Sequence, residues 1–272
     1  MEDLPIFVAS ELRQGALAAL ALADWPAKLA AVAALDESLP VDPAAMLAAP
    51  PSLPGRPAQP VLVAPARLKS RPAGTPQGRA ALVHALAHIE FNAVNLALDI
   101  VWRFPGMPDA FYRDWIVVAR EEASHFRLLN EHLATLGHAY GDFSAHNGLW
   151  DMAARTCDDV AARLALVPRV LEARGLDASP MIRAKLAAVG DARGAAILDI
   201  ILRDEIGHVA IGNRWYRWLC DTGGHDPVAW HAELAQRYAA PRQRGPFNLD
   251  ARRAAGFDER ELAALTAGDA NP

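Results

Sequence analysis

Long runs of Ala, Leu, Ile and Val at helical rather than alternating spacing dominate the chain after residue 77. Two of these runs have clear ends. The first predicts a helix over 78–104, stopped by Pro105 and Gly106, and the second predicts a helix over 109–136, stopped by Gly137. Because the link between them is short, we expect an antiparallel helical hairpin.

A second pair of helical patterns follows the first. One predicts a helix over 149–173 with Pro168 inside it, and the other predicts a helix over 191–220. A short helix is expected between them, after Ser179 and Pro180. No segment has the alternating pattern of a strand, so the sequence predicts an all-α protein with a four-helix core.

The region before residue 77 has a different character. Residues 10–35 predict two short helices with a break at Trp25 and Pro26. Ten of the chain's twenty prolines lie between residues 40 and 76. Since proline removes a backbone donor and clashes with a preceding helical turn, this stretch is expected to be an extended strap. We therefore divide the chain into N-terminal helices and strap (1–76), a four-helix bundle (77–222) and a C-terminal extension that packs on the bundle (223–272).

Composition narrows the class of protein. The chain of 272 residues is 52% apolar and 22% charged, which is typical of a globular protein. Its net charge of −5 argues against a broad basic surface of the kind that binds nucleic acid. Cys157 and Cys220 lie far apart, and we interpret them as reduced thiols. The first residues lack the pattern of a signal peptide, so we expect a cytoplasmic protein without a membrane span; the oligomeric state stays open.

Two short motifs carry the chemistry. The second long helix contains Glu122-x-x-His125, and the fourth contains Glu205-x-x-His208. Residues three apart lie on nearly the same face of a helix, so each pair directs a carboxylate and an imidazole to one side. Chance predicts fewer than one such match in a chain with nine histidines. The repeat therefore indicates a metal site.

Each motif has a glutamate upstream on the preceding helix. Glu90 lies among apolar neighbours such as Val83 and Val94, and Glu172 lies in a similar stretch. The spacing from Glu90 to Glu122 is 32 residues and that from Glu172 to Glu205 is 33. One Glu and one Glu-x-x-His from each hairpin form the ligand set of di-iron and di-manganese carboxylate bundles. The candidate ligands are Glu90, Glu122, His125, Glu172, Glu205 and His208.

The ligand types favour iron, with manganese or zinc as alternatives, because carboxylates and imidazoles suit these ions and no thiolate is available nearby. Asp204 and Glu121 precede the ligand glutamates and are candidates for orienting the imidazoles from a second layer. The alternative for these two acids is a salt bridge with the neighbouring Arg203 or Arg120. If the third helix ends near Gly175, Glu172 instead caps that end or pairs with Arg174, which would leave an asymmetric or single-metal site.

Five stretches carry a resemblance to a known family: residues 87–92, 121–125, 171–175, 204–208 and 245–248. They resemble an uncharacterised bacterial family of ferritin-like proteins, distantly similar to tRNA-modifying di-iron hydroxylases, over about residues 55–265. The resemblance implies a ferritin-like four-helix bundle with the six ligands at the positions given above. It implies no particular substrate.

Two functions are favoured as hypotheses. The first is an oxygen-activating oxidoreductase, a hydroxylase or oxidase, that uses two iron ions on an organic substrate. Its partners would be dioxygen, an electron donor for an oxygenase reaction, and a small molecule or modified nucleoside as substrate. The alternative is a ferroxidase or a metal-binding and storage protein that has no organic substrate.

Overall fold

The computed structural model describes residues 9–36, 38–69 and 71–269. Over these residues the protein is all-α, with no strand and one isolated bridge between Leu62 and Ala145. By compactness the chain divides into two units, Met1–Asn147 and Gly148–Pro272. The division at residues 76 and 222 that composition suggested stays a prediction.

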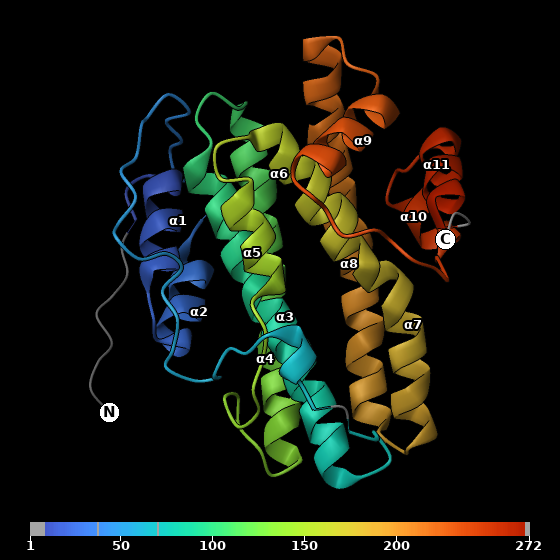
Figure 1. The fold of residues 1–272 in the computed structure, drawn as a ribbon. Helices are drawn as coiled ribbons and strands as arrows, with labels where there is room; N and C mark the ends of the chain where they lie inside the picture. The colour runs from blue at the N-terminus through green and yellow to red at the C-terminus, as the bar shows by residue number, and fades with distance from the viewer. Residues whose placement is uncertain (1–8, 37, 70, 270–272) are drawn as a thin grey trace. The chain divides into compact units, whose positions relative to one another are not determined.

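The first unit is built on a hairpin of two long helices, α3 (Pro76–Arg103) and α4 (Asp109–Thr135), which pack side by side (Figure 1). The Thr75 side chain caps α3 by accepting from the backbone N–H of Gly78. The predicted helices over 78–104 and 109–136 are confirmed to within two residues at each end.

Two shorter helices, α1 (Leu12–Ala21) and α2 (Trp25–Ala34), pack on this hairpin, as the sequence predicted. The buried Lys28 on α2 ties several parts of the unit together. Its ammonium group donates to the backbone oxygen of Gly55 at 2.8 Å and to Asn95 Oδ1 at 2.5 Å. The contacts connect α2, the strap and α3.

The described part of the proline-rich stretch is mostly extended, with a short helical turn, η1 (Pro65–Arg67), and hydrogen-bonded turns at residues 43–44 and 73–74. It pairs with the loop that follows α4: Val63 N donates to Ala145 O at 2.8 Å, and Ala145 N donates to Val61 O at 3.1 Å. The prediction of an extended strap is therefore confirmed. Backbone hydrogen bonds hold the strap to the loop that follows α4, within the first unit.

Helix α3 is long and apolar enough to cross a membrane by length and composition alone, with a mean hydropathy of 1.3 over its most apolar stretch. However, 78% of that stretch is buried inside the protein. Burial against neighbouring helices already accounts for its apolar character.

The second unit is centred on α7 (Ala173–Ala188) and α8 (Ala192–Gly223), which lie side by side (Figure 1). The Asp191 side chain caps α8 by accepting from Gly194 N at 2.8 Å. The predicted helix over 191–220 is confirmed, with a slightly later end. The remaining elements of this unit are α5 (Gly148–Arg155), α6 (Val160–Leu166), η2 (Val167–Glu172), α9 (Pro227–Arg237), α10 (Leu249–Ala254) and α11 (Glu259–Asp269).

The prediction of one helix over 149–173 is wrong. Helix α5 ends at Arg155, and α6 begins only at Val160, because the Asp159 side chain accepts from Ala162 N at 2.9 Å and starts a new helix. The segment η2 then follows as a wider π-helix, with Pro168 at its beginning. Pro168 has no N–H to give to the preceding turn, which favours a departure from α-helical bonding at this point.

The expected helix end near Gly175 and the separate helix after Pro180 are also wrong, because α7 runs without interruption through both residues. Pro180 cannot donate to the carbonyl of Leu176, four residues earlier. The side chain of Asn248, from the C-terminal extension, donates to that oxygen instead, at 3.2 Å. The extension therefore stabilises α7 at the position where proline weakens it.

A close approach fixes η2 against α8. A Cβ atom added at Gly212 would lie 2.6 Å from Cβ of Pro168. Gly212→Ala is therefore expected to destabilise the protein by about 1–3 kcal/mol through overpacking against a rigid ring. Gly207→Ala on the same helix, where an added Cβ meets open space, should instead stabilise it by about 0.5–1 kcal/mol. Urea unfolding of both variants tests this, and equal effects would contradict it.

Candidate metal centre

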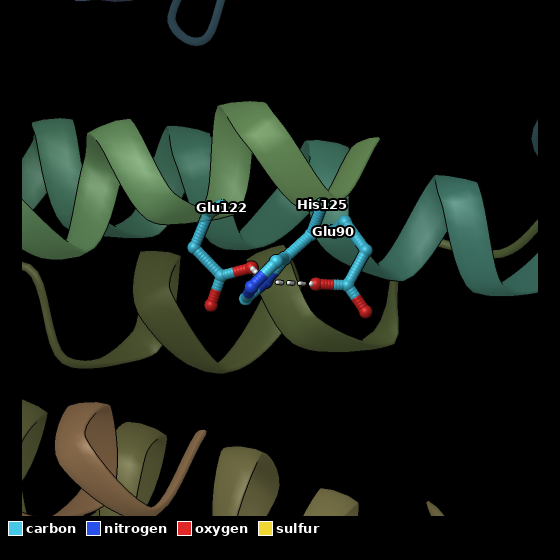
Figure 2. Close-up of side chains that lie close together, drawn as sticks. All are labelled: Glu90, Glu122 and His125. Atoms are coloured by element: carbon cyan, nitrogen blue, oxygen red, sulfur yellow. Dashed lines mark hydrogen bonds and ion pairs between the residues drawn. The ribbon is translucent and has the colours of Figure 1, made fainter. Parts of the chain in front are cut away.

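Three of the predicted ligands lie together in the first unit. Glu90 extends from α3, and Glu122 and His125 extend from successive turns of α4 (Figure 2). The Nδ1 atom of His125 is 3.4 Å from Oε2 of Glu90 and 3.4 Å from Oε2 of Glu122. One possible ligand atom from each residue lies within 4.8 Å of the others. The packing of α3 against α4 therefore brings two carboxylates and one imidazole close together.

This cluster is shielded from water. The exposed fractions of Glu90, Glu122 and His125 are 3%, 1% and 1%. In the metal-free protein, burial and the adjacent carboxylate of Glu122 raise the pKa of Glu90 to about 8. Burial lowers the pKa of His125, but hydrogen bonds and ion pairing with Glu122 and Glu90 outweigh this and raise it to about 11. The metal-free cluster therefore retains protons at neutral pH.

The donor set fits a first-row transition metal. Carboxylate oxygens and an imidazole nitrogen suit iron, manganese and zinc, and neither cysteine belongs to the cluster. Bringing two glutamates into a dry site is unfavourable unless a cation or protons compensate their charge. A divalent ion would take the place of those protons.

Metal uptake by this cluster should therefore release protons. At pH 7 Glu90 and His125 each carry a proton that a bound ion would displace, so binding should release up to about two protons. The affinity is accordingly expected to rise with pH, most steeply below pH 8. Titration calorimetry in buffers of different ionisation enthalpy measures the number released. Uptake with no proton release would contradict the assigned protonation.

The second unit holds the other three predicted ligands. Glu205 and His208 lie one turn apart on α8 and are 7% and 0% exposed. Oε2 of Glu205 is 3.9 Å from Nδ1 of His208. Glu172 ends η2, directly before α7. A Cβ added at Gly175 on the next turn would lie 3.9 Å from the carboxyl carbon of Glu205, so α7 passes close to that side chain.

The helix does not end at Glu172. The backbone of Glu172 is helical, and its side chain makes no capping hydrogen bond. The alternative in which this glutamate caps a helix end therefore does not apply. Its role as a ligand stays a prediction, as do the ligand roles of the other five residues.

The two acids proposed to orient the imidazoles have different surroundings. Asp204 accepts from Nε of Arg203 at 2.8 Å and from Nη2 at 3.1 Å, which is the salt bridge that the sequence left open as an alternative. Glu121 is half-buried on α4. Their contribution to histidine orientation stays a prediction.

Three other buried polar residues, His88, Tyr112 and Tyr216, have structural contacts. His88 is buried, and its Nδ1 lies 2.8 Å from the hydroxyl of Tyr140. Tyr112 donates to Phe104 O at 2.9 Å, and Tyr216 donates to Pro227 O at 2.9 Å. These contacts anchor loops to helices.

Sequence patterns did not single out two buried arginines of the second unit, Arg169 and Arg252. Their side chains are 3% and 0% exposed. The only available signal was local: Arg169 interrupts an otherwise apolar run from Leu164 to Leu171. A charge in such a run needs compensation, but the sequence did not show from where it would come.

Comparison with known proteins gives two matches. Residues 18–263 match the family described as "Protein of unknown function (DUF455)". An uncharacterized protein of Haemophilus influenzae is 53% identical over 213 residues, which cover 76% of this chain and 74% of that protein. No solved structure matches the chain.

Proposed function

The chain belongs to the DUF455 family of proteins of unknown function, and we propose that it is a metalloprotein that holds a pair of metal ions on carboxylate and imidazole ligands. The buried cluster of Glu90, Glu122 and His125 carries this proposal. A site of this composition has little reason to be maintained in a helical core without a cation, because apolar side chains would pack there at lower cost.

The second ion would use Glu172, Glu205 and His208. This set repeats the composition of the first, with Glu172 at the end of η2 and Glu205-x-x-His208 on α8. We propose a ferritin-like bundle for the fold, because this is the ligand set of the carboxylate bundles that hold two metal ions. Four carboxylates would then balance two divalent cations.

Iron is the proposed metal, with manganese or zinc as competitors. Two bound ferrous ions would supply electrons for the reduction of dioxygen, which makes an oxygen-activating oxidoreductase the leading function. The protein's own contribution is to hold the ligands in place and to exclude water from the core around Glu122 and His125. The proposed partners are dioxygen, an electron donor, and a small organic molecule or modified nucleoside.

Anaerobic reconstitution of the full-length protein with ferrous iron tests the proposal. We expect about two irons per chain by elemental analysis, in keeping with the paired ligand sets. Admission of air should consume dioxygen, measured with an oxygen electrode. Selective zinc binding without oxygen uptake would contradict the oxidoreductase.

Two further outcomes separate the functions. Oxygen consumption that loads many irons per chain into a large assembly, seen by light scattering, would favour the ferroxidase or storage alternative. His208→Ala should lower iron content, whereas His138→Ala should not, because His138 is partly exposed, pairs with the nearby Asp142 and is not one of the candidate ligands. Equal iron loss in both variants would indicate nonspecific binding.

A further inference from the structure

The second unit contains a cavity of about 310 Å³ between η2 and the C-terminal elements. Its wall is largely apolar, with Val170, Val228, Ala235, Phe257 and Leu265 among the lining residues. Its size lies at the lower end of the range for small-molecule pockets. The cavity belongs to this unit alone and includes none of the six candidate metal ligands.

Two buried arginines line this cavity, and each has one unused donor. Arg169 donates through Nε to Asn213 Oδ1 at 2.7 Å and through Nη2 to Glu261. Arg252 donates through Nε and Nη2 to Asp177, at 3.1 and 2.7 Å. Within the described part of the chain, the buried Nη1 atoms of both arginines have no hydrogen-bond partner.

An unused guanidinium donor in a buried position is unfavourable, because the group has left water without gaining an acceptor. Rotation cannot relieve it, since the planar fork is already fixed by the bonds at Nε and Nη2. Aromatic rings contact both groups: the guanidinium carbons of Arg169 and Arg252 lie 5.2 and 5.5 Å from the centroid of Phe257. A ring attracts the cation but is only a weak acceptor for an N–H group.

The charge of the lining is positive. Three arginines, Arg169, Arg242 and Arg252, face a single lining carboxylate, that of Glu261. Asp177 adds a second negative charge next to Arg252, and the positive charge of Arg217 next to Glu261 is balanced by Asp258, 3.8 Å from Arg217. His231 also lines the cavity, where burial lowers its pKa to about 4 and leaves it neutral. An excess of positive charge therefore remains for a ligand.

We propose that this cavity binds the phosphate group of a small phosphate monoester, with Nη1 of Arg169 and Nη1 of Arg252 as donors and the apolar wall around its organic part. Guanidinium donors match phosphate oxygens in geometry and charge. A carboxylate has two oxygens, which a single fork can satisfy, whereas the three terminal oxygens of a monoester accept from two separate arginines. The inference is independent of the metal site.

Phenyl phosphate is the probe for a direct test. Calorimetric titration of the full-length protein at constant ionic strength should show saturable binding at one site per chain. Inorganic phosphate, which lacks the apolar part, should bind about tenfold more weakly, since burial of a ring's apolar surface adds at least this factor. Benzoate should bind more weakly than phenyl phosphate. Absence of binding at millimolar phenyl phosphate, or a preference for benzoate, would overturn the proposal.

Two variants localise the site. Arg252→Lys keeps the charge but loses the fork, and it should weaken phenyl phosphate binding by about 10- to 100-fold. Because this change also touches the pair with Asp177, a second variant leaves the arginines intact: Ala235→Phe fills the cavity and should abolish binding.

The matched control is Ala229→Phe, which places the same ring on an exposed position of α9 outside the cavity. It should bind phenyl phosphate as the wild type does, and all three variants should keep the wild-type metal content. Wild-type affinity in Ala235→Phe would overturn the assignment of the ligand to this cavity.

Discussion

Glutamine in place of Glu122 is expected to remove most metal binding and to make the metal-free protein less stable at pH 7 than the wild type. In the metal-free protein at pH 7 Glu90 carries a proton, and Glu122 compensates the protonated imidazole of His125, so removing the charge of Glu122 leaves a buried cation with less compensation. With metal, the variant has lost a ligand, and the affinity should fall by at least about 100-fold. That loss removes about 2.7 kcal/mol of metal-linked stabilisation.

The same variant should change the dependence of stability on pH. The pKa of Glu90 rises on folding from 4.5 to about 8, so its contribution to stability is present below pH 4.5 and is lost as the pH rises through 8. The metal-free wild type should therefore become less stable between pH 5 and pH 9. Glu122→Gln should lose less over this range, because burial still raises the pKa of Glu90 but the neighbouring charge is gone. Urea unfolding with and without chelator measures both effects.

Glu131→Gln provides the control on the same helix, because this glutamate is exposed and outside the cluster. It should reproduce the wild-type stability with metal and without it. If Glu122→Gln retained the full stabilisation by metal, Glu122 would not be a ligand.

The second large effect is expected at Glu261. This buried carboxylate accepts from Arg169 on η2 and from Arg217 on α8, so it connects α11 to both segments. Glu261→Gln keeps an acceptor but leaves the charge of Arg169 uncompensated in the core, which should cost about 3–5 kcal/mol. Because Arg169 and Glu172 share η2, metal binding by the second set should weaken as well.

Glu233→Gln is the matched control, since Glu233 and Arg237 form an exposed ion pair on α9. Loss of such a pair should cost less than about 1 kcal/mol. Urea unfolding of both variants gives the comparison. A similar small loss in Glu261→Gln would show that the buried network contributes little to stability.

The first hairpin could be predicted from the sequence because strong local signals mark its ends. Pro105, Gly106 and Gly137 stop the helices, and an apolar face runs along each of them. The proximity of Glu90 to Glu122 follows from the hairpin geometry, since the helices run antiparallel and both residues lie on inward faces. The helix ends and the apolar faces are set by residues that lie close together in the sequence.

The second unit was harder to predict because distant residues override its local signals. Pro180 is tolerated inside α7 because Asn248, nearly seventy residues later, supplies the missing donor. The cavity draws its two buried arginines from η2 and α10 and much of its apolar wall from α9 and α11. A short stretch of sequence therefore shows neither that α7 tolerates a proline nor that two distant arginines line the same cavity.

The wide turn of η2 has a consequence for how this protein could change over generations. An α-helix that gains one residue without growing longer must absorb it in such a turn. Each residue in an α-helix rotates the next one by about 100° around the axis. Loss of a single codon between Val167 and Leu171 would rotate the residues that follow by this angle in a regular helix, but here it would restore the tighter winding and leave Glu172 facing nearly the same way. Lineages could thus lose this extra residue while all six candidate ligands keep their places.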